Sequence, residues 1–325
     1  MGYSHPGNPS GAEVQAEAFV YPTVVRRAPP ATLFKYFGPD GTRLFDSWHI
    51  RFSQPGAFND PFECNPHIAG WGTADEELEK AREVWEEHLE RLYDDFCKQF
   101  GKRIEFEEFR GRKLPDKEAD VQAELAVIRA KAYPQMGEGV TAMVNQGIGV
   151  LCLCEQPDSL LMWAHYAARH TGFSVEFDTT SEFFNSDKPP AHVQFSEVDA
   201  TTYKTEYGYL RPVQYVKNRP SVVLTKLDFD VFTQKGDQWA YESEWRMLMP
   251  LDYAAAGTEK FHDGYRLCLW PVPPSAVKRV ILGARAGEAL EARVRQLSAC
   301  RETEHIVLER AQVDLQHFQV NLGPL

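Results

Sequence analysis

Residues 239–250 read W-A-Y-E-S-E-W-R-M-L-M-P and place two glutamates one residue apart among aromatic and apolar neighbours. The apolar run that follows them, closed by a proline, predicts a buried β-strand over residues 244–251. Side chains alternate across a strand, so we expect Glu242, Glu244 and Arg246 to share one face. Two carboxylates on one face repel each other unless a cation, a shared proton or a ligand lies nearby. The stretch therefore predicts either a functional site or a structural ion-pair network that Arg246 neutralises.

Further strands are predicted on both sides of this stretch, where alternating or apolar segments are bounded by turn residues. They cover residues 31–36, 48–53, 149–155, 172–178, 211–216, 265–270, 277–282, 306–311 and 318–321. A short helix over residues 159–169 and an amphipathic helix over residues 286–299 lie among them. Because strands and helices do not alternate strictly, the sequence predicts an α+β fold with a mixed, mainly antiparallel sheet and flanking helices.

The segment from residue 73 to about residue 132 differs in composition from the rest of the chain. It is dense in Glu, Lys and Arg, and its apolar residues recur with a helical period. Thr73 and Glu76 form the pattern of a capping box at its start. We interpret it as a charged helical insertion in a single α+β domain that spans residues 31–325. Residues 1–30 are rich in Gly, Pro and Ala, which predicts a flexible N-terminal tail.

Composition limits the classes of function. The chain has 325 residues and a net charge of −12, which argues against broad binding to nucleic-acid backbones. No run of about 20 apolar residues is present to cross a bilayer, and no secretory signal is evident. The six cysteines are scattered, as is usual for free thiols in a reducing compartment. We therefore expect a cytoplasmic protein that is not attached to a membrane.

The predicted helix at 159–169 carries an unusual set of polar and aromatic residues. Trp163, His165 and Tyr166 lie close together, and His170 follows near a Thr-Gly helix end. Histidines five residues apart do not match the one-turn spacing of helical zinc pairs, so metal binding here is possible but not favoured. The set is either a satisfied structural group or one wall of a ligand site.

A second candidate segment is the loop F-N-D-P-F-E at residues 58–63, which Pro55 and Pro61 stiffen. Asn59 and Asp60 favour two interpretations. Their side chains either bond back onto the backbone in a rigid turn or project from the loop into a cleft.

Several segments together resemble the bacterial domain-of-unknown-function family numbered 2971. In chain order they are LFKY, IRFSQPGAFNDPFE, CLCEQPDSLLMWAHYAARHTGFSVEFD, WAYESEWR and VKRVILG. The resemblance runs from about Leu33 to the C-terminus, and its N-D-P-F, W-x-H-Y and E-x-E-W-R elements are specific when taken together. The charged insertion is the least family-like part. The family name implies no activity.

The E-x-E element, followed by an apolar strand and Pro250, is similar to an element of ADP-ribosyltransferases. That similarity implies that the second glutamate, Glu244, holds a ribose hydroxyl of NAD and stabilises the oxocarbenium-like cation as nicotinamide leaves. It also implies that Lys35 and Tyr36, on an early strand, clamp NAD. The chain departs from the pattern because it lacks a clear Arg or His at the first position and an S-T-S in the middle.

These observations lead us to expect an enzyme that binds a nucleotide-type ligand, most concretely NAD as a co-substrate, and modifies a macromolecular acceptor. The expected catalytic residues are Glu244, Glu242, His165 and Tyr166. The expected ligand-binding residues are Lys35, Tyr36, Asn59, Asp60, Trp163, His170 and Arg246. One alternative is a metal-dependent hydrolase or nuclease that uses Asp60, both histidines and both glutamates. The other is a non-catalytic sensor or interaction module whose polar cluster is structural.

Overall fold

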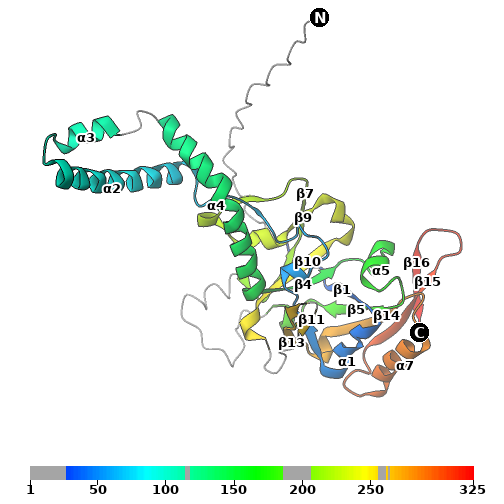
Figure 1. Ribbon diagram of the computed structural model, residues 1–325. Helices are drawn as coiled ribbons and strands as arrows, with labels where there is room; N and C mark the ends of the chain where they lie inside the picture. The colour runs from blue at the N-terminus through cyan, green and yellow to red at the C-terminus, as the bar shows by residue number, and fades with distance from the viewer. Residues whose placement is uncertain (1–26, 114–117, 186–205, 255–260, 263) are drawn as a thin grey trace, which may run out of the picture.

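The computed structural model describes residues 27–113, 118–185, 206–254, 261–262 and 264–325 (Figure 1). In these residues the central feature is an eight-stranded sheet in the order β16-β15-β14-β5-β1-β4-β10-β6. Its strands are β1 (Thr32–Phe37), β4 (Ile148–Cys154), β5 (Phe173–Asp178), β6 (Leu210–Pro212), β10 (Glu244–Pro250), β14 (Val277–Leu282), β15 (Val307–Val313) and β16 (Val320–Pro324). Neighbours pair antiparallel except β14 and β15, which are parallel. The predicted α+β class with a mixed, mainly antiparallel sheet is therefore confirmed.

The strand predicted from the E-x-E stretch lies inside the sheet. β10 pairs with β4 along its whole length, from Glu244 opposite Cys154 to Pro250 opposite Ile148. Trp245 and the two methionines of β10 point into the largest core cluster, and the alternate positions face the other side of the sheet. The apolar sequence of this strand follows from its burial on both faces.

The strand begins at Glu244, as predicted, but the alternation expected to include Glu242 does not extend back before it. Residues 237–242 form a 3-10 helix, η6 (Asp237–Glu242), and Ser243 is left-handed with a φ of 44°. Glu244 and Arg246 therefore share a face of β10, as predicted, but Glu242 does not belong to the strand. From the end of η6 its carboxylate pairs with Lys235, which also pairs with Glu244.

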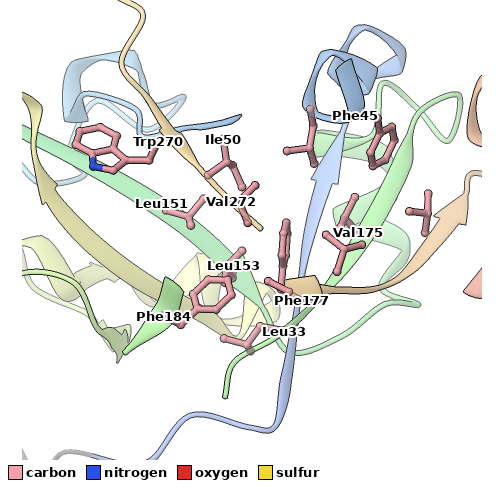
Figure 2. Packing of buried hydrophobic residues seen from close by; sticks show 14 of the residues in the cluster. Leu33, Phe45, Ile50, Leu151, Leu153, Val175, Phe177, Phe184, Trp270 and Val272 are labelled. Atoms are coloured by element: carbon pink, nitrogen blue, oxygen red, sulfur yellow. The ribbon is translucent and has the colours of Figure 1, made fainter. Parts of the chain in front are cut away.

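Helices and a small sheet cover the two faces of the main sheet. On one face α1 (Arg43–Ser47), α7 (Glu288–Arg295) and the pair β2 (His49–Arg51) and β13 (Leu269–Pro271) enclose the largest core cluster, part of which Figure 2 shows. On the other face α5 (Leu160–Tyr166) packs against β1. Phe34 and Tyr36 contribute to the α5 side and Leu33 to the opposite core, because successive side chains of β1 alternate.

Helix α5 ends at Tyr166, earlier than the predicted boundary at residue 169. Ser159 caps its start by accepting a hydrogen bond from the Met162 amide at 3.4 Å. After its end, Ala168, Arg169 and His170 all have positive φ, a conformation that costs about 1–2 kcal/mol per residue outside glycine. Backbone hydrogen bonds hold this turn, including His170 N to Trp163 O at 3.1 Å.

The charged insertion forms a helical arm. Figure 1 shows α2 (Ala74–Phe100) and α3 (Phe106–Lys113) extending away from the sheet, while α4 (Glu118–Gly147) runs back toward it. The predicted capping box is present: the Thr73 hydroxyl accepts from the Glu76 amide, and the Glu76 carboxylate accepts from the Thr73 amide at 2.7 Å. At the base of the arm, buried Glu77 accepts hydrogen bonds from Arg129 at 2.8 Å and from Tyr133.

Helix α4 continues well past the predicted end of the insertion near residue 132. Pro134 does not end it, although proline removes one helical hydrogen bond. Its C-terminal half carries Val140 and Val144, which pack in a buried cluster with Ile68 and Val222. Tertiary packing therefore continues the helix to Gly147 and anchors the arm on the core.

The remaining described elements are short. They are β3 (His67–Gly70) with β8 (Ser221–Val223), β7 (Gln214–Val216) with β9 (Gln234–Gly236), and β11 (Phe261–His262) with β12 (Tyr265–Arg266). The predicted strands at 211–216 and 265–270 are thus each divided between two sheets. Residues 1–26 of the predicted tail lie outside the described part of the chain. Among the described residues, no helix is long and apolar enough to cross a membrane.

Gly172 marks a close backbone approach between the α5 turn and β1. A Cβ at this position would collide with the carbonyl oxygen of Phe37, which belongs to the β1–β5 ladder. We expect Gly172→Ala to lower the free energy of unfolding by about 1–3 kcal/mol, because backbone cannot move aside as a side chain can. Chemical denaturation measures the change.

Gly139→Ala is the matched control, because nothing lies within 4 Å of a Cβ at this exposed helical position. We expect it to raise the free energy of unfolding by about 0.5–1 kcal/mol through helix propensity. Equal effects of the two substitutions would contradict the close approach at Gly172.

Candidate functional site

A cavity lies where β1 and β4 separate. The two strands pair at Phe34 opposite Cys154, and beyond this pair a cavity of about 170 Å³ opens between them. Its walls come from β1, β4, the loop around Asn59, α5, β9 and the junction of η6 with β10. The lining residues are Phe34, Lys35, Tyr36, Ser53, Phe58, Asn59, Glu63, Val150, Cys152, Leu153, Cys154, Met162, Tyr166, Lys235, Glu242 and Glu244.

Three buried carboxylates meet around one ammonium group at this cavity. The Lys235 Nζ lies 2.6 Å from Glu242 Oε2, 3.1 Å from Glu244 Oε2 and 3.3 Å from Glu63 Oε2. Each of these four side chains exposes no more than 4% of its surface. At such burial the carboxylates depend on these charged partners rather than on water.

Arg246 forms the second cationic centre, behind Glu244. Its Nε and Nη2 bond the two carboxylate oxygens of Glu244 at 2.8 and 2.9 Å, a bidentate arrangement that fixes both groups. Its other contacts include the Glu63 carboxylate and, at 2.6 Å, the carbonyl oxygen of Phe232. Burial opposes charge on Glu244, but Arg246 and Lys235 outweigh it and hold the pKa of Glu244 well below its usual range.

Glu242 differs from Glu244 in its partners. Burial raises the pKa of Glu242 above its usual value, although Lys235 opposes the shift. The Tyr166 hydroxyl donates a hydrogen bond of 2.6 Å to Glu242 Oε1 and accepts one of 3.4 Å from the Asn59 amide. Burial, and then Glu242 itself, raise the pKa of Tyr166, so this hydroxyl stays protonated and remains a donor. Glu242 thus joins η6 to α5 across the cavity.

The predicted pair Lys35 and Tyr36 belongs to β1, which forms another part of the cavity wall. The Lys35 ammonium donates to the carbonyl oxygen of Cys152 at 3.1 Å, across the gap between β1 and β4, and burial lowers its pKa. The Tyr36 hydroxyl donates to the carbonyl oxygen of Gln156 at 2.8 Å, and its ring meets Trp163 edge-on at 5.0 Å. Both residues line the cavity.

The other predicted residues do not line this cavity. Asp60 accepts the amide of Phe62 at 2.9 Å, which is the rigid-turn interpretation of the loop. Trp163 is fully buried and donates its indole N–H to Pro157 O at 2.8 Å. His170 stacks on Trp163, while His165 is exposed with its ring 6.3 Å from that of Tyr241.

The structure therefore brings together six of the predicted residues, with Arg246 directly behind them. The six are Lys35, Tyr36, Asn59, Tyr166, Glu242 and Glu244. Among the described residues, no group of three His, Cys, Asp or Glu side chains is arranged to hold a metal ion.

Two members of the cluster were not predicted as site residues, Glu63 and Lys235. Glu63 is the last residue of the F-N-D-P-F-E segment. Its closeness in sequence to Asn59 was the signal that could have identified it as a site residue. Lys235 lies on β9, seven residues before Glu242, in a stretch without regular periodicity. The only signal for Lys235 was indirect. The paired carboxylates predict a nearby cation, but the sequence does not indicate which residue provides it.

Comparison with known proteins supports one part of the resemblance. The model of a family described as "Protein of unknown function (DUF2971)" matches residues 162–247. This match begins in α5 and ends in β10, so it contains Tyr166, Lys235, Glu242 and Glu244, while β1 and the Asn59 loop lie before it. No curated protein and no solved structure matches the chain.

Removal of Lys235 tests its position at the centre of the cluster. We expect Lys235→Met to destabilise the protein by about 3–5 kcal/mol, because three buried carboxylates lose their shared partner. Lys98→Met is the control, since Lys98 pairs with Asp95 on an exposed helix face, and we expect no measurable change there. Denaturant unfolding of both variants checks the difference, and similar stabilities would contradict the central role of Lys235.

The lowered pKa of Glu244 predicts an acid-dependent contribution to stability. A carboxyl with a folded-state pKa below its unfolded value of about 4.5 stabilises the fold above pH 4.5, and this contribution falls as the pH falls further. We expect the stability difference between the wild type and Glu244→Gln to be full at neutral pH and to shrink below about pH 4.5. Denaturant unfolding of both proteins, measured at intervals from about pH 3 to about pH 7, checks this expectation. A constant difference would refute an ionised Glu244.

Proposed function

We propose that this protein is an NAD-consuming transferase of the ADP-ribosyltransferase type and that the cavity between β1 and β4 receives the nicotinamide-ribosyl end of NAD. The observation that supports this most is the environment of Glu242. It is a buried carboxylate at the wall of an aromatic-lined cavity, held by Tyr166 and Lys235. Such a carboxylate is placed to face positive charge that develops on a ribosyl carbon.

The charges of the cluster suit this chemistry. Three carboxylates are balanced by two cations, Lys235 and Arg246, while the Lys35 ammonium bonds a backbone carbonyl. The Lys35 ammonium also lines the cavity, so three acids face three basic groups, and Glu242 has one charged partner, Lys235. Positive charge that develops beside Glu242 would be attracted to this carboxylate, and the low local dielectric would strengthen the attraction.

The contacts distinguish the two glutamates of the E-x-E element. Both oxygens of Glu244 accept charged hydrogen bonds, whereas one oxygen of Glu242 accepts from Lys235 and the other from the neutral Tyr166 hydroxyl. We therefore assign Glu244 as a positioning residue that holds Lys235 and Arg246. We assign the catalytic role to Glu242, which is the reverse of what the similarity to ADP-ribosyltransferases implies. In the reaction the C–N bond to nicotinamide breaks, its electron pair leaves with nicotinamide, and an acceptor nucleophile bonds the ribosyl carbon. Glu242, with its raised pKa, takes the proton that the acceptor loses.

The residues present also fit the co-substrate. The cavity offers a planar ring an aromatic surface, formed by Phe34, Tyr36, Phe58 and Tyr166. Met162 adds a polarisable sulfur to this surface. The metal-dependent alternative receives less support, because Asp60 is used within its own turn and neither His165 nor His170 lines the cavity.

Glu242→Gln tests the proposal, because it removes the charge and retains size. We expect nicotinamide release from NAD by the purified protein to fall by about 10²–10³-fold, while circular dichroism shows that the fold is retained. The control is Glu79→Gln, an exposed acid on α2, which should leave turnover unchanged. A wild-type protein without NAD turnover, or full turnover by Glu242→Gln, would reject the proposal. Metal-dependent cleavage of nucleic acid, assayed in parallel, would favour the hydrolase instead.

A further inference from the structure

Three aromatic side chains form a row beside the cavity. The Trp239 and Tyr241 ring centroids are 6.1 Å apart with their planes at 39°, and the Tyr241 and His165 centroids are 6.3 Å apart with their planes at 34°. Trp239 and Tyr241 belong to η6, and His165 belongs to α5. The row therefore joins the two elements that carry Glu242 and Tyr166.

Each member of this row adjoins a residue that lines the cavity. The Lys235 Nζ lies 5.0 Å from the centroid of the Trp239 ring, a cation–π distance. Tyr241 precedes Glu242 directly, and the His165 ring lies 6.3 Å from that of Tyr166. The row thus borders the same wall that Glu242, Lys235 and Tyr166 form.

The row is open to solvent, unlike the aromatic residues of the core. His165 is exposed, and Trp239 and Tyr241 are half-buried. Indole and phenol rings that remain accessible beside a cavity offer flat apolar faces to a planar ligand, and stacking on such faces tolerates any base.

The size of the cavity indicates what the row binds. Pockets that enclose drug-sized ligands have volumes of about 300–1,000 Å³. The cavity here is about 170 Å³, so it can enclose one end of a dinucleotide, and the other end must lie outside it. The row is an aromatic surface that adjoins the cavity wall.

We propose that Trp239, Tyr241 and His165 form a stacking platform for the adenine base of a nucleotide ligand. This inference rests on the proposed function for the identity of the whole ligand, because the nicotinamide-ribosyl end would occupy the cavity. A free nucleotide is favoured over a nucleic-acid strand, since the chain carries a net charge of −12 and a strand would need a basic track for its phosphates.

The two halves of the dinucleotide serve as separate probes. AMP carries the adenine base, and nicotinamide mononucleotide carries the end assigned to the cavity. We expect Trp239→Leu to weaken AMP binding, measured by calorimetry, by about 5–150-fold, the effect of losing one base stack. Binding of nicotinamide mononucleotide should change less than about twofold, because Trp239 does not line the cavity.

Conservative and remote variants separate stacking from folding. Tyr241→Phe retains the ring and should bind AMP as the wild type does, whereas Tyr241→Leu should not. Trp71→Leu removes a different exposed indole, 46% accessible and next to α2, and should leave AMP binding unchanged. Melting temperatures of all variants show whether the fold is retained.

The results distinguish this inference from the proposed function. Failure of wild-type protein to bind AMP, or equal AMP affinity in the wild type, Trp239→Leu and Tyr241→Leu, would overturn the platform. Loss of AMP binding in both leucine variants with retention in Tyr241→Phe supports it. Failure of nicotinamide mononucleotide to bind, or absence of NAD turnover, would reject the proposed function. The AMP measurements would still show whether the stacking platform binds adenine.

Discussion

One ammonium group shared by three buried carboxylates is the interaction on which the site depends. Lys235 brings together acids from a loop, a 3-10 helix and a strand, Glu63, Glu242 and Glu244. Removal of so many charges from water is costly, and their mutual attraction compensates only when the geometry is good. Arg246 supplies that geometry by holding Glu244 and Glu63 from behind. The cluster thus joins the covering elements of one sheet face to the interior strand β10.

The cavity exists because this face of the sheet is interrupted. Where β1 leaves β4, backbone groups of both strands lose ladder partners, and buried groups of this kind must find others. Lys35 provides one, since its ammonium bonds the carbonyl oxygen of Cys152 across the gap. The same separation admits aromatic side chains from β1, the Asn59 loop and α5. An opening inside a sheet, rather than at its edge, therefore places charged and aromatic groups in one enclosed space.

The fold was predictable where periodicity follows burial. The strand boundaries at Val277–Leu282 and the capping box at Thr73 follow from local sequence, and both are present in the structure. The site was predictable only in part. Residues that meet through long-range packing, such as Lys235 with Glu63, carry no periodic signal. Ser243 has a left-handed backbone, and φ at one residue cannot be inferred from the polarity of the sequence. The alternating pattern therefore did not reveal that η6 precedes the strand. Likewise, the packing of Val144 that continues α4 is a tertiary effect.

The break in alternation at Ser243 also explains how two nearby glutamates acquire different chemistry. In a continuous strand, Glu242 and Glu244 would have had equivalent surroundings and would have competed for the same cations. The turn instead sends Glu242 toward Tyr166 on α5, while Glu244 bonds Arg246, and both glutamates share Lys235. The pKa of Glu244 is lowered and that of Glu242 is raised, which is the divergence that the proposed roles of a fixed charge and a proton acceptor require. A single left-handed residue therefore gives two neighbouring glutamates different partners and opposite pKa shifts.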